Sequence, residues 1–130
     1  MIIGIGLKSI KAHSEGKVIQ KVDVQSTPTI KSIEKRDILN LNDVLSIGFS
    51  FSISYKPDIG SIDFEGEVLC QTELAEKALE LWKAEARLDD GIAQEVLNAI
   101  FRKCLTHAVS LADELKLPPP VSFPVVKKKG

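Results

Sequence analysis

Residues 44–55 read VLSIGFSFSISY, and this stretch decides the fold. Its odd-numbered positions from 45 to 55 carry large apolar side chains, whereas its even-numbered positions from 46 to 54 carry only serine or glycine. Successive side chains of a β-strand point to opposite faces of the sheet, so the pattern predicts one apolar face and one small, polar face. Such a strand is typical of an antiparallel sheet that packs on one side only.

A partner strand follows directly, because residues 56–71 read KPDIGSIDFEGEVLCQ. The first five of these residues form turns readily, and the rest alternate between apolar and mainly acidic side chains. A four-residue loop predicts a hairpin in which Tyr55 pairs with Ile62 and Phe51 lies opposite Gly66. This register places every large apolar side chain of both strands on the same face, which a one-residue slip would not do.

Weaker alternation upstream predicts two further strands. Residues 3–12 alternate and end at a predicted turn over residues 13–16, and a second run begins near Val18. After Pro28 the apolar residues Ile30 and Ile33 are three positions apart, which indicates a kink or bulge. A turn over residues 40–43 leads into the strong strand, so we predict four main strands in a meander or a close variant of one.

The C-terminal half has helical periodicity. Residues 73–87 predict a short helix capped by Thr72, and Asp90 is placed to cap a second helix of about 24 residues, roughly 36 Å long. The prolines at 118–120 end it. The expected fold class is therefore α+β, with a four-stranded antiparallel sheet followed by a short and a long helix on one face and an extended proline-rich tail. We expect one domain over residues 1–126 and a basic tail over residues 127–130.

Composition excludes several classes of function. The 130 residues include 17 Lys and Arg against 18 Asp and Glu, a net charge of −1, which argues against a dedicated nucleic-acid-binding protein. We expect at most weak contact with nucleic acid, made through Lys127, Lys128 and Lys129. The longest apolar or glycine run, residues 1–7, is too short for a membrane span and lacks the charge of a signal peptide. Two cysteines outside any metal-ligand spacing predict a reduced, cytoplasmic protein without a metal or cofactor.

Each candidate chemical motif has a simpler structural explanation. Gly4-Ile5-Gly6 continues a strand pattern rather than forming a phosphate loop. Asp63, Glu65 and Glu67 could hold a hard cation, but a solvated or subunit-facing sheet surface explains the same alternation. The pair Cys104–His107 is explained by a buried thiol beside a surface imidazole. The pair Asp89–Asp90 is explained by a turn with a helix cap. We therefore predict that the protein is not an enzyme.

Apolar residues outside the expected core are more informative. The helix residue Val109, the tail residues and Leu69 on the acidic face exceed what one helix–sheet interface must bury. The loop residues Ile38, Leu39 and Leu41 also lie where polar residues are expected. Surplus apolar surface marks a subunit or partner interface. The alternative is a tail that folds back over its own core.

The order of these elements resembles SecB, the export chaperone that holds unfolded polypeptides, and its SecB-like relatives. Four segments carry the resemblance: IGLKSI at residues 5–10, LNDVLSI at 41–47, IFRKCL at 100–105, and Leu117 with PVSF at 120–123. Together they span most of the chain. The lysine-rich end differs from the acidic, glutamine-rich end of SecB, so the resemblance does not extend to a SecA translocation ATPase as partner.

The resemblance implies a homo-oligomer, either a dimer or a tetramer, in which client chains lie in apolar grooves. By position in the family pattern, the expected client-binding residues are Pro28, Ile30, Ile33, Leu111, Leu115, Val121 and Phe123. The resulting hypothesis is an ATP-independent holding chaperone or peptide-binding module for unfolded or extended polypeptides. Two alternatives stay open: an accessory subunit of a ribosome- or secretion-associated assembly anchored by the basic tail, and a small-ligand or enzymatic pocket between helices and sheet.

Overall fold

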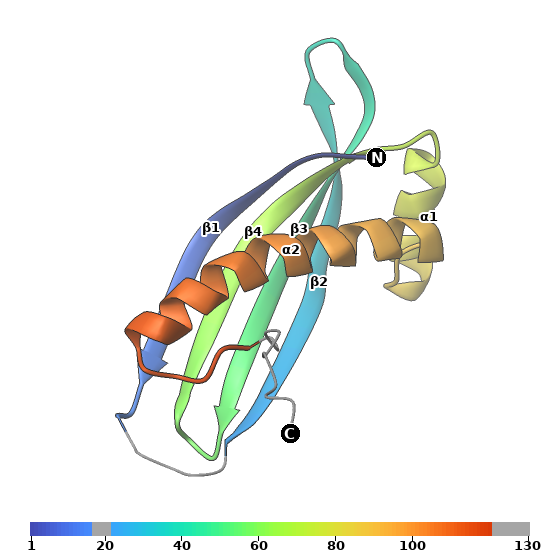
Figure 1. Ribbon diagram of the computed structural model, residues 1–130. Helices are drawn as coiled ribbons and strands as arrows, with labels where there is room; N and C mark the ends of the chain where they lie inside the picture. Colours follow the sequence, from blue (N-terminus) through green and yellow to red (C-terminus); the bar gives the residue numbers. More distant parts are fainter. Residues whose placement is uncertain (17–21, 121–130) are drawn as a thin grey trace, which may run out of the picture.

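A computed structural model describes residues 1–16 and 22–120 and confirms the predicted α+β class (Figure 1). Four strands come first and two helices follow. The elements are β1 (Ile2–Ser14), β2 (Asp23–Ile38), β3 (Leu41–Lys56), β4 (Gly60–Gln71), α1 (Ala75–Glu85) and α2 (Asp90–Glu114). No helix in the described part of the chain has the length and apolar character needed to cross a membrane.

The strand order is β1-β4-β3-β2, so the predicted meander is wrong for the first strand. Strands β2, β3 and β4 are consecutive neighbours, but β1 pairs antiparallel with β4 on the far side of the sheet. The reason is burial: β4 carries fully buried apolar residues such as Phe64 and Val68, and a strand of this kind is better placed inside a sheet than at its edge.

The β3–β4 register differs from the predicted one by two residues. Tyr55 pairs with Gly60 and Ile53 with Ile62, and the ring packed against Gly66 is that of Phe49. The loop is shorter than predicted because Ile59 turns back into the core, where its N–H donates to the carbonyl of Tyr55 at 3.0 Å. A two-residue shift keeps every side chain on its face, so alternation alone could not detect it.

The predicted irregularity after Pro28 is confirmed as a register shift between Ile30 and Ser32. Ile30 lies opposite Phe49, and Ile33 lies opposite Ile47. Both partners are core residues of β3, so the extra residue brings two apolar side chains that are three positions apart onto the same face.

Two predicted turns are placed differently in the structure. Strand β1 continues through Ser14, into the turn predicted for residues 13–16. The turn predicted at residues 40–43 is a tight one at Leu39 and Asn40, because Ile38 pairs with Leu41 and extends the β2–β3 hairpin. This hairpin end projects beyond the rest of the sheet (Figure 1), and Leu39 at its tip is 88% exposed.

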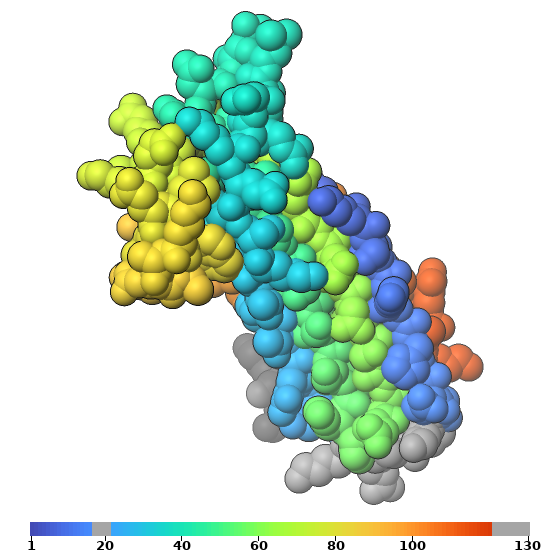
Figure 2. Space-filling view, turned by 180° about the vertical axis from the view of Figure 1, so that it is seen from behind, coloured from blue at the N-terminus to red at the C-terminus, as the bar shows by residue number. Residues whose placement is uncertain are grey.

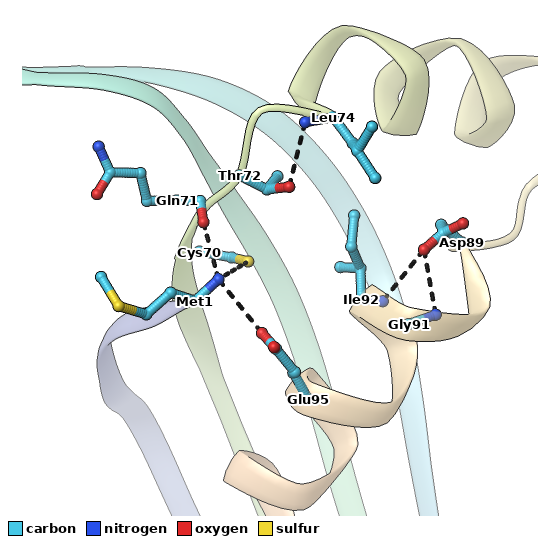
Figure 3. Close-up of polar contacts among 9 residues, drawn as sticks. All are labelled: Met1, Cys70, Gln71, Thr72, Leu74, Asp89, Gly91, Ile92 and Glu95. Carbon is cyan, nitrogen blue, oxygen red and sulfur yellow. Dashed lines mark hydrogen bonds and ion pairs between the residues drawn. The ribbon is translucent and has the colours of Figure 1, made fainter.

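The helix starts also differ slightly from the prediction. Asp89, not Asp90, caps α2: its carboxylate accepts hydrogen bonds from the N–H groups of Gly91 and Ile92 at 3.1 and 3.3 Å (Figure 3). Thr72 accepts from the N–H of Leu74 at 3.1 Å, but α1 itself has no side-chain cap. Since either aspartate of the pair can cap a helix, sequence spacing could not choose between them.

Both helices lie on one face of the sheet, and α2 crosses it diagonally (Figure 1). Its buried stripe repeats every four residues and packs chiefly over β1 and β4. The stripe consists of Ile92, Val96, Ile100, Cys104, Ala108 and Ala112. Helix α1 packs against β2 and β3 instead. The core therefore lies between one sheet face and two helices that cover different strands.

Candidate functional site

The placement of α2 leaves the inner face of β2 only partly covered. Register pairs Val24 of β2 with Tyr55 and Pro28 with Phe51, both of which are core residues of β3. The β3 side chains are fully buried, whereas Val24 and Pro28 are partly exposed. Some apolar surface is therefore left partly exposed at the β2 side of the sheet.

Helix α2 adds a wall to this surface. The ring of Phe101 meets that of Phe51 edge to face, with 5.5 Å between ring centroids, and Phe51 is also the cross-strand neighbour of Pro28. Leu105 follows one turn later on the same flank of the helix, and both side chains are partly exposed. We call the apolar surface formed by Val24, Pro28, Ile30, Phe101 and Leu105 the β2 strip.

The structure divides the predicted client-binding residues. Pro28 and Ile30 lie in the β2 strip, but Ile33 is only 7% exposed. It lies in the part of β2 that α1 covers, where Lys35 bonds Glu76 of α1 at 2.8 Å. Ile33 is therefore a core residue rather than a freely accessible contact.

The C-terminal members of the predicted set lie elsewhere. Leu111 and Leu115 are partly buried against the core at the end of α2, the helix that packs chiefly over β1 and β4. Val121 and Phe123 lie outside the described residues. The structure thus brings together two of the seven predicted residues, and the sequence reasoning did not assign Val24, Phe101 or Leu105 to this surface. The four-residue spacing of Phe101 and Leu105 on one flank of the helix was the signal that could have identified them.

A short strap follows α2 and closes the far end of the sheet. Lys116 adopts a left-handed backbone (φ 58°), which ends the helix and turns the chain back. Leu117 is then buried at Gly60, and the hydroxyl of Tyr55 donates to the carbonyl of Pro118 at 2.8 Å. Residues 115–120 are therefore held against the loop between β3 and β4.

A concave site lies on the opposite flank of α2, beside β1. This pocket has a volume of about 690 Å³ and an apolar floor that includes Ile2 and Ile5. Its wall is polar and partly basic, and includes Asn98, Arg102 and Lys103. It lies beside the outer edge of β1, which pairs with no strand other than β4 among the residues that the structure describes.

The two sheet edges differ in how open they are. Each edge strand has two register shifts, but β2 also carries Pro28, which has no N–H group to donate to another strand. Strand β1 contains no proline, and its bulges lie at Ile3 and Lys8. The β1 edge is therefore the better site for strand addition.

Asp63, Glu65 and Glu67 of β4 pair with Ser52, Ser50 and Gly48 of β3, which places them on the helix-free face of the sheet, the face seen in Figure 2. Lys31 pairs with Glu65 at 3.1 Å, and Arg36 pairs with Glu67 at 3.0 Å. The hydroxyl of Ser46 donates to Glu67 at 2.8 Å, which is the main cause of a lowered pKa at that carboxyl. Basic side chains of β2, which lies beyond β3 from β4, thus pair with Glu65 and Glu67, as expected for a solvated face. Within residues 1–16 and 22–120, no three His, Cys, Asp or Glu side chains converge as a metal site would require.

The two cysteines are core residues. Burial raises the pKa of the Cys104 thiol to about 11, and it also raises the pKa of Cys70. Near Cys70, the amine of Met1 lies 3.9 Å from the sulfur and pairs with Glu95 at 3.3 Å (Figure 3). A nucleophilic cysteine needs a lowered thiol pKa, so the Cys104–His107 pair does not supply one.

Three side chains that the sequence did not single out, Ser61, His13 and Glu15, form a hydrogen-bonded row where β1 ends and β4 begins. The imidazole of His13 is 3.2 Å from the hydroxyl of Ser61 through one nitrogen and 3.2 Å from Glu15 through the other. The side chains of His13 and Glu15 are 60% and 50% exposed. Acyl-transfer sites stabilise developing charge with preorganised groups that are shielded from water, and side chains as exposed as these lack that shielding.

Of the comparisons with known proteins, the comparison with solved structures bears on the fold. No family model matches the sequence, and no curated protein matches it. Among solved structures, the chain is similar to the Mycobacterium tuberculosis Rv1957 SecB-like chaperone, solved in complex with a ChAD peptide from the Rv1956 HigA1 antitoxin. The TM-score is 0.60 at 16% sequence identity, over 98% of this chain and 89% of that chain.

This chain therefore has a SecB-like fold, and the resemblance stated from the sequence is confirmed at that level. At 16% identity the likeness concerns the fold, and one fold can carry many functions. What the protein does has to be argued from its own surfaces.

Proposed function

We propose that this protein is a holding chaperone or peptide-binding module that binds extended, apolar segments of unfolded polypeptides without using ATP. The observation that carries the proposal is the β2 strip, an apolar surface built from one strand and one helix and left partly exposed. The SecB-like neighbour that was solved with a bound peptide supports the same role.

The chemistry of the β2 strip suits clients of varied sequence. Its side chains are aliphatic or aromatic, so binding would come from burial of apolar surface, which is non-directional and needs no particular partner sequence. Val24 and Ile30 are six residues apart on one strand, about 20 Å in extended chain. This length would contact about six residues of a client.

Holding without ATP is supported by the position of the one glycine motif that resembles a phosphate loop. Gly4 and Gly6 lie within β1 and pair with Leu69 and Glu67 of β4. A phosphate loop must instead open a helix, so that free N–H groups point at the phosphate. In this proposal, clients bind and leave passively.

The proposal includes a homo-oligomer, with the second copy at the β1 edge. This edge is open to strand addition, and the pocket beside it offers apolar floor residues and basic wall residues to a neighbouring chain. The β2 strip lies on the other side of α2, so pairing at β1 would leave it accessible to clients.

The test is suppression of client aggregation, measured by light scattering after a chemically denatured protein is diluted into buffer. Wild-type protein should suppress scattering at an equimolar ratio of oligomer to client. Ile30→Ser should weaken client binding by about fivefold, corresponding to about 1 kcal/mol for one partly exposed apolar side chain.

Leu39→Ser is the matched control, because Leu39 is more exposed than Ile30 but lies at the hairpin tip, outside the β2 strip. It should leave protection unchanged. Equal losses in both variants, or no protection by the wild type, would contradict the proposal. RNA binding with a log–log salt slope of about −2 to −3 that disappears without residues 127–130 would instead favour the tail-anchored accessory subunit.

A further inference from the structure

The strap after α2 determines where the rest of the chain begins. Tyr55 holds the carbonyl of Pro118 at 2.8 Å, and Tyr55 is also the cross-strand partner of Val24. Val24 is one end of the β2 strip. The chain therefore leaves its last fixed point beside the surface that we propose for clients.

The sequence that follows this point has the character of a client. Residues 121–125 read VSFPV, with apolar side chains at Val121, Phe123 and Val125 on alternate positions. Five extended residues span about 17 Å, close to the 20 Å of the β2 strip. Pro124 has no N–H group, so this segment would bind through its side chains and not as a complete added strand.

We propose that residues 121–125 bind the β2 strip of their own chain and compete with clients for it. The client part of this inference rests on the proposed function, whereas the docking of the tail does not. It assigns Val121 and Phe123 a role opposite to the one that the family resemblance implies. They occupy the client surface until a client displaces them, and they do not form part of its wall.

The arrangement explains how an apolar strip remains protected when no client is present. An exposed apolar surface is a site of self-association, and a tethered segment at millimolar effective concentration covers it reversibly. A segment that binds with a dissociation constant of 0.1 to 1 mM would lower client affinity by about two- to tenfold at an effective concentration near 1 mM. Clients that bind more tightly than this would still displace it.

The first experiment uses the full-length double variant Val121→Ser/Phe123→Ser. Its affinity for a fluorescently labelled, permanently unfolded probe, reduced and carboxymethylated α-lactalbumin, is compared with that of the wild type by anisotropy. We expect binding about two- to tenfold tighter in the double variant. Unchanged or weaker binding would overturn the inference, because side chains that contact the client would lower affinity when removed.

A charge control separates apolar competition from repulsion by the end of the chain. The full-length variant Lys127→Ser/Lys128→Ser/Lys129→Ser retains residues 121–125. It should bind the probe as the wild type does. A gain equal to that of the double variant would overturn the inference.

A second experiment does not depend on client binding. The synthetic peptide PPVSFPVV, residues 119–126, is added to the double variant, and methyl signals of Ile30 and Leu105 are followed by NMR. Saturable shifts at these two residues, absent with a peptide carrying Phe123→Ser, would support the inference, and their absence would overturn it. If the peptide shifts these signals but neither protein binds the probe, the proposed function fails and the self-docking tail stands.

Discussion

Among the described glycines, Gly66 is the one at which an added Cβ would have the least room. A Cβ at this position would collide with the carbonyl oxygen of Gly6 and approach the ring of Phe49 to 3.1 Å. Two strands and an aromatic ring thus meet at a position that only glycine can occupy, which is why the ring of Phe49 covers it.

We expect Gly66→Ala to destabilise the fold by about 2 to 4 kcal/mol, because neither backbone can move away without disturbing the β1–β4 pairing. Gly6→Ala is the control, since a Cβ at Gly6 would meet no atom within 4 Å. It should change the free energy of unfolding by no more than about 0.5 kcal/mol. Urea unfolding of both variants checks the difference, and equal effects would contradict the packing argument.

On the helix-free face of the sheet, a polar cluster links all four strands. Glu67 of β4 accepts from Ser46 of β3 at 2.8 Å and pairs with Arg36 of β2 at 3.0 Å. Lys8 of β1 approaches the same carboxylate at 4.0 Å. The serine, followed by the two cations, lowers the pKa of Glu67 from its ordinary value of 4.5.

This lowered pKa gives the cluster a defined pH dependence. Because the folded-state pKa lies below the unfolded-state pKa, the ionised carboxylate stabilises the fold above the unfolded pKa, and this contribution disappears as pH falls through the folded pKa. Urea midpoints of the wild type and Glu67→Gln should therefore differ at pH 7, and the difference should be smaller at about pH 3, below the ordinary pKa of a glutamate. A difference that is the same at both pH values would show that ionisation of Glu67 does not matter.

For the whole molecule, the open β1 edge predicts self-association. Static light scattering at several concentrations should give a mass of at least twice the 14.2 kDa of one chain. Edge strands with unpaired N–H and C=O groups are templates for another chain, and β1 is the less protected of the two edges. A strict monomer at every concentration would remove the second copy from the proposal and leave the β2 strip to be tested alone.

Local sequence determined the elements of this protein and the faces that they bury. The alternation over residues 44–55 gave β3 its buried face, because a pleated strand sends successive side chains to opposite sides. The phase change between Ile30 and Ile33 indicated a bulge for the same reason, and the prolines at 118–120 indicated that α2 ends before them, as it does at Glu114. The SecB-like fold could be recognised from this order of elements.

Tertiary structure decided how the elements meet. A two-residue register shift and the placement of β1 beside β4 both preserve the alternation, so only packing of the whole sheet could choose between them. The same applies to the candidate site. Ile30 and Ile33 look alike in the sequence, but α1 covers the part of β2 that holds Ile33, and only the packing of α2 on the sheet brings Phe101 to Phe51 of β3. Burial depends on contacts between residues far apart in the chain, and periodicity describes only neighbours.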